Sequence, residues 1–202
     1  MSFEPSVGAG PGPETRGRPL VWLGEVDNAR SRAERHRVRD LVVGAVTGHS
    51  SHALVIGQRC PSCGSPAHGP PTVAEPAGWH VSTATAGALM AVAVHRDPIG
   101  VDVEPAGRLD GSNWADLVRV VPGLQALRDR LGAAADLVDV WTATEALGKA
   151  IERGLEATPA ELAVGLDRFR LVHASTSTEP GRRVAVAVDA TAATPLYWGP
   201  AA

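Results

Sequence analysis

The stretch Ile99-Gly-Val-Asp-Val-Glu104 alternates apolar and polar residues over six positions. A period of two predicts a half-buried β-strand, which Pro105 ends. Asp102 and Glu104 then share one face, with side chains roughly 7 Å apart along the strand. Two carboxylates this close repel each other unless a cation lies between them. The stretch therefore fits either a solvated edge with two ordinary acids or one wall of a cation site.

A second stretch, Trp141-Thr-Ala-Thr-Glu-Ala-Leu-Gly-Lys149, lies within the longest helical pattern, residues 133–154. Glu145 and Lys149 stand one turn apart on the same helical face. An exposed Glu–Lys pair is common on helices and by itself means little. Lys149 is, however, the single lysine of a chain that otherwise uses arginine, which indicates a position that needs the compact charge of lysine.

Length and composition limit the classes of protein to consider. The 202 residues, 44% apolar and 20% charged, fit one or two small globular domains with a substantial core. The net charge of −3 gives no reason to expect a nucleic-acid partner. There is no run of eighteen apolar residues that would predict a membrane span. Residues 1–18 are rich in Gly and Pro without a signal pattern, so we expect a flexible tail and a cytoplasmic protein.

The periodicities predict an α+β fold with two similar lobes, residues 19–98 and residues 99–202, each with a long helix packed on a small, mainly antiparallel sheet. Strands are expected over residues 20–26, 53–57, 99–104, 161–172, 183–190 and 197–198, with a hairpin over 79–94. Helices are expected over 29–46, over 113–131 as two short segments, and over 133–154. Asp27 or Asn28 is the expected cap of the first helix, and a turn is expected near residues 179–181.

The first predicted helix is crowded with arginines, at positions 30, 32, 35, 37 and 39. They fit a solvated face beside a core stripe. They also fit an anion-binding face, because the guanidinium fork suits phosphates.

Cys60-Pro-Ser-Cys63 lies in a Gly/Pro-rich loop that also carries His68. Two interpretations stay open for these residues. They form part of a zinc site, with a fourth ligand at His80 or elsewhere, or they form a tight turn with reduced thiols.

Gly100-Val-Asp-Val-Glu104 followed by Trp141-Thr-Ala-Thr-Glu-Ala-Leu-Gly-Lys149, with a hairpin upstream, resembles the two signature motifs of the 4′-phosphopantetheinyl transferases. The likeness is to the monomeric, two-lobed members that activate peptide and polyketide synthases in natural-product biosynthesis, and it covers most of residues 20–198. It implies Mg²⁺-dependent transfer of the 4′-phosphopantetheine arm of coenzyme A to a serine of an acyl or peptidyl carrier protein. The other product is 3′,5′-ADP, and a monomer is expected.

The resemblance also implies roles for the motif residues. Asp102, Glu104 and Glu145 would be the ligands of Mg²⁺, a cation that prefers oxygen donors. Glu145 would also take the serine proton. Lys149 would contact coenzyme A and neutralise charge that develops on the phosphate.

Further contacts with coenzyme A are expected from the first lobe. Arg35 and Arg39, on charge and position, are candidates for the 3′-phosphate, and Thr83 of the hairpin is a candidate for a second contact.

Three positions depart from the family pattern. The hairpin reads Ser82-Thr-Ala-Thr85, without the usual histidine, Thr144 replaces a lysine before the metal-binding glutamate, and Pro70 replaces a basic residue after His-Gly. They support an alternative from another class. In this alternative the chain is a diverged homologue that binds a carrier protein or another ligand, or catalyses a different reaction in the same cleft.

Overall fold

The computed structural model describes residues 17–26, 31–109, 112–132, 134–175 and 181–198. Its first part contains β1 (Leu20–Glu25), α1 (Arg32–Thr47), the short 3-10 helix η2 (Ser51–Ala53), β2 (Val55–Gln58), β3 (Pro71–Glu75), β4 (His80–Ala86) and β5 (Leu89–His95). Its second part contains β6 (Gly100–Pro105), α2 (Trp114–Val120), α3 (Gly123–Leu131), α4 (Leu137–Ala150), η3 (Gly154–Glu156), α5 (Pro159–Arg168), β7 (Phe169–Ser175), β8 (Arg182–Asp189) and β9 (Leu196–Trp198).

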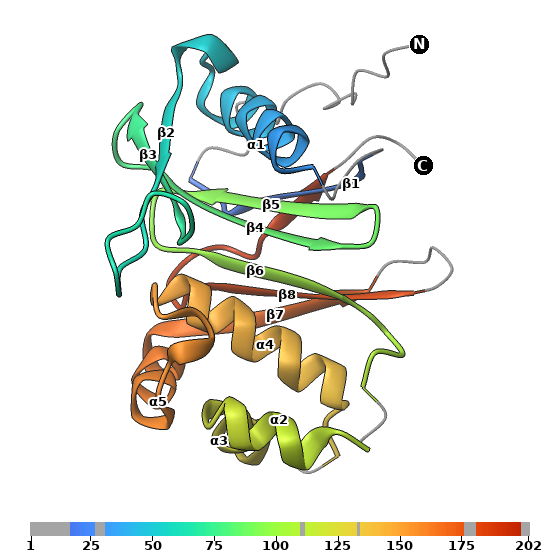
Figure 1. Cartoon of the computed structure of the whole chain (residues 1–202). Coiled ribbons are helices and arrows are strands. Elements are labelled where there is room, and N and C mark those ends of the chain that lie inside the picture. The colour runs from blue at the N-terminus through green and yellow to red at the C-terminus, as the bar shows by residue number, and fades with distance from the viewer. Residues whose placement is uncertain (1–16, 27–30, 110–111, 133, 176–180, 199–202) are drawn as a thin grey trace.

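Six strands form the larger sheet, in the order β2-β3-β4-β5-β1-β9. The hairpin β4–β5 runs antiparallel, and β1 pairs antiparallel with β5 but parallel with β9. Helix α1 covers the outer face of this sheet (Figure 1). Trp22, Val38, Val42 and Met90 are among the fully buried residues that fill the space between helix and sheet.

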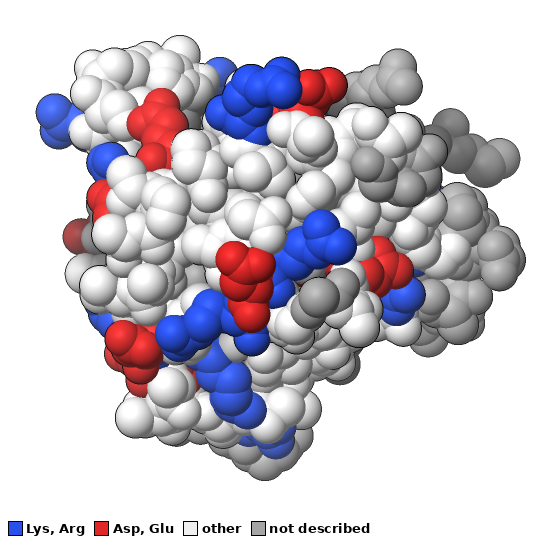
Figure 2. All heavy atoms as spheres, turned by 90° about the horizontal axis from the view of Figure 1, so that it is seen from below, with Lys and Arg blue, Asp and Glu red and all other residues white. Residues whose placement is uncertain are grey.

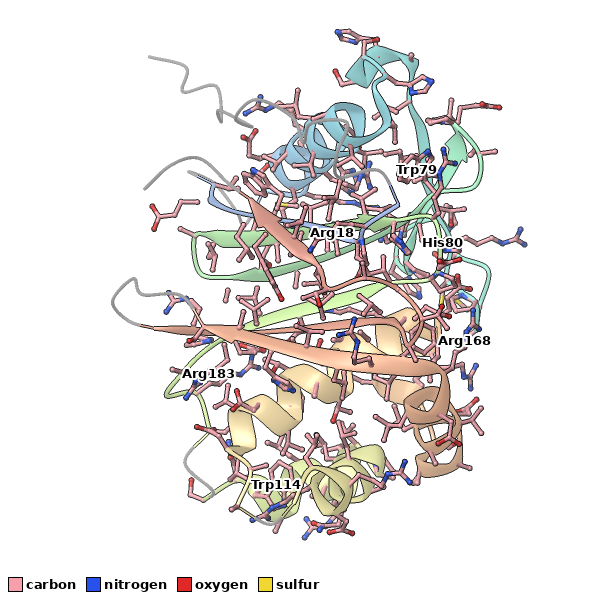
Figure 3. The ribbon with its side chains drawn as sticks, turned by 180° about the vertical axis from the view of Figure 1, so that it is seen from behind. Arg18, Trp79, His80, Trp114, Arg168 and Arg183 are labelled. Carbon is pink, nitrogen blue, oxygen red and sulfur yellow. The ribbon has the colours of Figure 1, made fainter. Side chains whose placement is uncertain are left out.

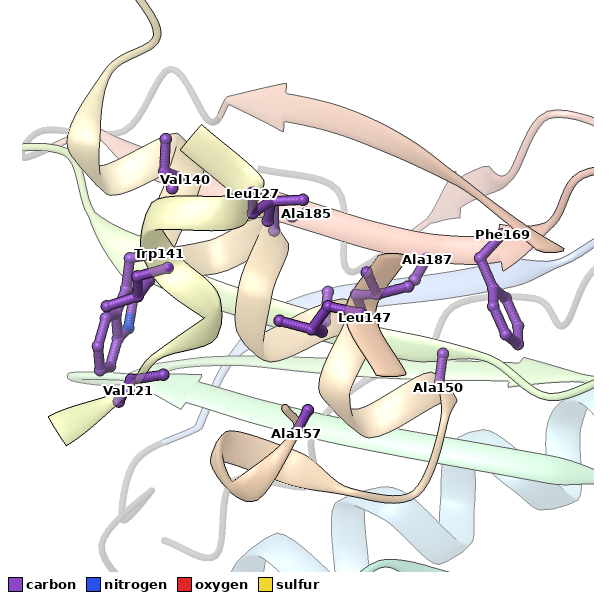
Figure 4. Close-up of a cluster of buried hydrophobic side chains, with 14 of the residues drawn as sticks. Val121, Leu127, Val140, Trp141, Leu147, Ala150, Ala157, Phe169, Ala185 and Ala187 are labelled. Atoms are coloured by element: carbon purple, nitrogen blue, oxygen red, sulfur yellow. The ribbon is translucent and has the colours of Figure 1, made fainter. Parts of the chain in front are cut away.

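Three strands form the smaller sheet, in the order β6-β8-β7. Its face towards the larger sheet packs in a layer of small and β-branched residues, including Val101, Val103 and Val186. Its other face is covered by α4, with the remaining C-terminal helices beyond (Figure 1). Figure 4 shows the buried cluster on this side, to which Leu147 of α4 and Phe169 of β7 both belong.

The predicted α+β class is confirmed. The division into two similar lobes stays a prediction, because the two sheets differ in size and β9, from the second half of the chain, pairs with β1 in the first. None of the described helices is long and apolar enough to cross a bilayer.

Two sequence predictions about α-helices are wrong. Ser31 caps α1 with its side chain, in place of Asp27 or Asn28, which lie outside the described residues. The expected strand over residues 161–172 begins only at Phe169, because residues 159–168 form α5. Thr158 and Glu161 make a reciprocal capping box at its start, and this local start signal outweighs the weak alternation that follows.

The strand β6 is buried on both faces and is not half-buried as predicted. It is an edge strand of the smaller sheet, but the backbone N–H of Val101 donates to Ser82 Oγ of β4 in the other sheet. The face of β6 that carries Val101 and Val103 packs between the two sheets, and the face that carries Gly100 lies under α4. The expected turn near residues 179–181 falls mostly outside the described residues.

Candidate functional site

The close approach of α4 to β6 positions the site. A side chain at Gly100 would overlap the carbonyl oxygen of Ala146, so glycine allows the helix backbone to lie directly on the strand. Asp102 and Glu104 follow Gly100 on the same face of β6, and Glu145 precedes Ala146 on α4. The structure therefore brings the three predicted carboxylates together, with one oxygen of each within 4.8 Å of the others.

Asp102 is the most deeply placed of these acids, at 4% exposure. Lys149 Nζ donates to Asp102 Oδ1 at 2.7 Å and to the carbonyl of Val101 at 3.1 Å. Burial raises the pKa of Asp102 to about 7, and the nearby Lys149 charge only partly offsets this. The second carboxylate oxygen, Oδ2, is buried and has no hydrogen-bond partner among the described residues.

Glu104 is held by two groups that the sequence did not reveal as partners. The indole N–H of Trp141 donates to Glu104 Oε1 at 3.1 Å, and the guanidinium of Arg108 forms an ion pair with the same oxygen. Glu145 lies 3.5 Å from Lys149 Nζ. Two cations therefore stand beside three carboxyl groups, one of which, Asp102, ionises only near pH 7.

These residues fit a hard divalent cation. Carboxylate oxygens are the donors that Mg²⁺ prefers, and it usually keeps several waters for substrate oxygens to displace. The orphaned Asp102 Oδ2 is a buried acceptor that costs free energy until a cation or a donor meets it.

A cavity of about 680 Å³ adjoins this cluster through Lys149. It lies between α1, the loop after β2, the β4–β5 hairpin and the segment that follows α4. All four residues expected to contact coenzyme A line it: Arg35, Arg39, Thr83 and Lys149. Residues distant along the chain therefore line one cavity.

The same cavity contains Arg32, one of the helix arginines noted in the sequence, and His36, which sequence reasoning did not single out. With Arg35 and Arg39 they occupy positions i, i+3, i+4 and i+7, which form one helical face. This helical spacing in the sequence would have indicated that His36 lies on the same face as the three arginines. Burial, followed by the charges of Arg39 and Arg32, lowers the pKa of His36, so an anion bound here would reverse part of that shift.

The loop between β2 and β3 brings the second candidate group together. The ligand atoms of Cys60, Cys63 and His68 all lie within 4.8 Å of one another. His80 does not belong to this group. It lies at the start of β4 (Figure 3), where its backbone pairs with Thr72 of β3 and with His95 of β5. His80 is therefore not brought to this group, and a fourth ligand elsewhere stays a prediction.

The face of the molecule seen from below carries charges of both signs. Figure 2 shows this face with acidic and basic side chains side by side. Arg130 pairs with Asp167, and Arg153, which also lines the cavity, pairs with Glu161.

No family model matches the sequence, and no curated protein matches it significantly.

Proposed function

We propose that this chain transfers the 4′-phosphopantetheine arm of coenzyme A to a serine of a carrier protein. The observation that carries the proposal is the junction of two features. A three-carboxylate cluster contacts Lys149, which lines a cavity, and Arg35, Arg39 and Arg32 line the same cavity. A ligand with a pyrophosphate and a separate phosphate matches a divalent-cation site next to an arginine cluster.

Each residue then has a chemical task. Asp102, Glu104 and Glu145 would hold Mg²⁺, which neutralises phosphate charge when bound. Arg35 and Arg39 attract the 3′-phosphate. Thr83, which lines the same cavity, offers a hydroxyl.

Lys149 and Glu145 act on the reacting groups. Glu145 accepts the proton of the carrier serine, whose oxygen forms a bond to the β-phosphorus of coenzyme A. The bond from that phosphorus to the bridging oxygen breaks, and 3′,5′-ADP leaves with its electrons. Lys149, at 27% side-chain exposure, places a positive charge where negative charge develops in this step.

The test is direct transfer. The protein is incubated with coenzyme A, Mg²⁺ and a panel of apo carrier proteins, and the carriers are weighed by mass spectrometry. We expect the mass of a phosphopantetheine arm on one serine. Glu145→Gln and Lys149→Ala should abolish the gain, whereas Glu25→Gln, a matched change at an exposed acid outside the cavity, should not. A wild-type protein that binds no coenzyme A and modifies no carrier contradicts the proposal.

A second candidate function is supported by the three departures from the family pattern. Thr144 is buried and donates its hydroxyl to the carbonyl of Val140 in its own helix, so it cannot act as a cationic contact. Ala84 lies in the core between the sheets, and Pro70 lines the cavity without a donor. A diverged homologue would bind a different anionic ligand in this cavity. Tight binding of a simple nucleoside phosphate, with no transfer from coenzyme A, would favour it.

A further inference from the structure

The β2–β3 loop forms a second group of potential metal ligands, separate from the carboxylates. Cys60 is partly exposed, Cys63 is exposed, and both thiols are free. Cys63 Sγ lies 3.3 Å from His68 Nε2. The bond lengths of a tetrahedral zinc ion place a sulfur and a nitrogen ligand about 3.6 Å apart, so this pair stands close to the required separation.

The backbone of the loop is built to hold this arrangement. The Cys60 carbonyl accepts from Gly64 N–H at 2.8 Å, and Cys60 N–H donates to Ser65 O at 2.9 Å. These bonds close a tight turn that carries both cysteines. Gly64, with a φ of 71°, takes a left-handed conformation that favours glycine.

A second glycine returns the chain to the first cysteine. Gly69 has a φ of 109°, and a side chain there would collide with the backbone of Arg59 and Cys60. The chain therefore returns to the backbone of Arg59 and Cys60 directly after His68. This close backbone approach brings His68 near the turn that carries Cys60 and Cys63. The loop backbone therefore brings the three ligands together.

We propose that Cys60, Cys63 and His68 bind one Zn²⁺ ion, with a water molecule as the fourth ligand. Two thiolates and an imidazole form a donor set that zinc prefers, whereas Mg²⁺ prefers the carboxylates of the other cluster. Binding releases the thiol protons. The fourth position faces solvent, because Cys63 and His68 are exposed.

The ion would fix one wall of the cavity. Gln58 donates to the carbonyl of Gly69 at 2.6 Å and accepts from Arg32 at 2.8 Å, which ties the loop to α1. Ser62 Oγ donates to Glu156 at 2.8 Å, which ties it to η3. A zinc-clamped loop therefore bridges the two sides of the cavity. This inference does not depend on which reaction the cavity supports.

The experiment measures metal in the full-length protein. The chain is purified in reductant without chelator, and its zinc content is measured by mass spectrometry. We expect one equivalent per chain. The apo protein should regain one Zn²⁺ in competition with a chromophoric chelator, and Co²⁺ should produce the sulfur-to-cobalt charge-transfer absorption that only thiolate ligation gives. These readouts need no variant.

Variants then assign the ligands. Cys60→Ser with Cys63→Ser should remove the cobalt absorption, and His68→Ala should weaken zinc binding at least tenfold, as checked alongside circular dichroism for folding. His52→Ala, a matched change at another exposed histidine, and Asp102→Asn should both keep full zinc content. Three outcomes would overturn the proposal: no zinc bound by the wild type, no thiolate absorption with Co²⁺, or zinc that follows Asp102 and not the cysteines.

Discussion

Asp102 shows how one buried group can be poised for a cation. One of its oxygens binds Lys149, and the other has no partner within the described part of the chain. Burial of an ionised carboxylate is costly, so the proton is retained up to about pH 7. A divalent cation would compete with that proton, and the balance between them depends on pH.

The first prediction concerns this competition. Mg²⁺ binds the ionised carboxylate, so its affinity should be full above the pKa of about 7 and should fall as the pH drops below it. The decline should approach roughly tenfold per pH unit. Calorimetric titration of Mg²⁺ between pH 5.5 and 8.5 measures it. A flat profile in the wild type would show that Asp102 is not a ligand.

Arg108 competes with a metal for Glu104, since its guanidinium pairs with the same carboxylate oxygen that accepts from Trp141. Arg108→Ala removes this competitor, and we expect Mg²⁺ to bind about two- to fivefold more tightly, the range for a partly exposed ion pair. Arg119→Ala, which breaks the exposed pair with Asp116, should leave the affinity unchanged. Weaker binding after Arg108→Ala would mean that Arg108 helps to hold the site together.

Trp141 also orients Glu104, through the hydrogen bond from its indole N–H. Trp141→Phe keeps the ring but removes the N–H that bonds Glu104, and the loss of such a supporting contact costs about 10–100-fold in metal affinity. Calorimetry measures the loss, and thermal unfolding without metal tests whether the fold is intact. An unchanged affinity would show that Glu104 is oriented by Arg108 alone.

At the scale of elements, the site depends on how closely α4 lies on β6. Glu145 can meet Asp102 and Glu104 only because Gly100 has no side chain to lift the helix. The helix also packs against Gly154 through Gly148, where a side chain would collide. The absence of a side chain at Gly100 thus determines how closely Glu145 approaches Asp102 and Glu104.

Gly100→Ala should therefore destabilise the fold and weaken metal binding together. Inserting a methyl group into so tight a contact costs about 1–3 kcal/mol, and the displaced helix carries Glu145 away from the strand. Urea unfolding and Mg²⁺ titration measure the two effects. Gly107→Ala is the matched control, because a side chain there meets open space. Equal behaviour of the two variants would argue against this packing role.

At the scale of the whole molecule, the chain returns to its own beginning. β9 pairs in parallel with β1, and Leu196 N–H donates to the carbonyl of Pro19 at 2.9 Å. Tyr197 packs against the core between the sheets. The strand β9 thus pairs with the first strand, β1, and forms one edge of the larger sheet.

Truncation after Pro195 should expose the edge of β1 and remove Tyr197 from the inter-sheet core. We expect a loss of about 2 kcal/mol from the lost apolar burial, a fall in Tm of about 4–8 °C, and a tendency to aggregate through the open edge. Truncation after Trp198 keeps the strand and is the control. Equal Tm values for the two truncated chains would contradict a stabilising role for β9.

The sequence by itself determined the strand at residues 99–104, the helix carrying Glu145 and Lys149, the β4–β5 hairpin and the identities of the candidate ligands. It could do so because these depend on local period and on residue type. Where two local signals conflicted, as at residues 159–168, the capping box outweighed the alternation.

Only the tertiary structure decided what surrounds these residues. The burial of both faces of β6, the unpartnered oxygen of Asp102, the pairing of Arg108 with Glu104 and the place of His36 in the cavity all require contacts between different elements. Desolvation and ion pairing depend on neighbours that are distant along the chain, and a linear pattern does not specify them.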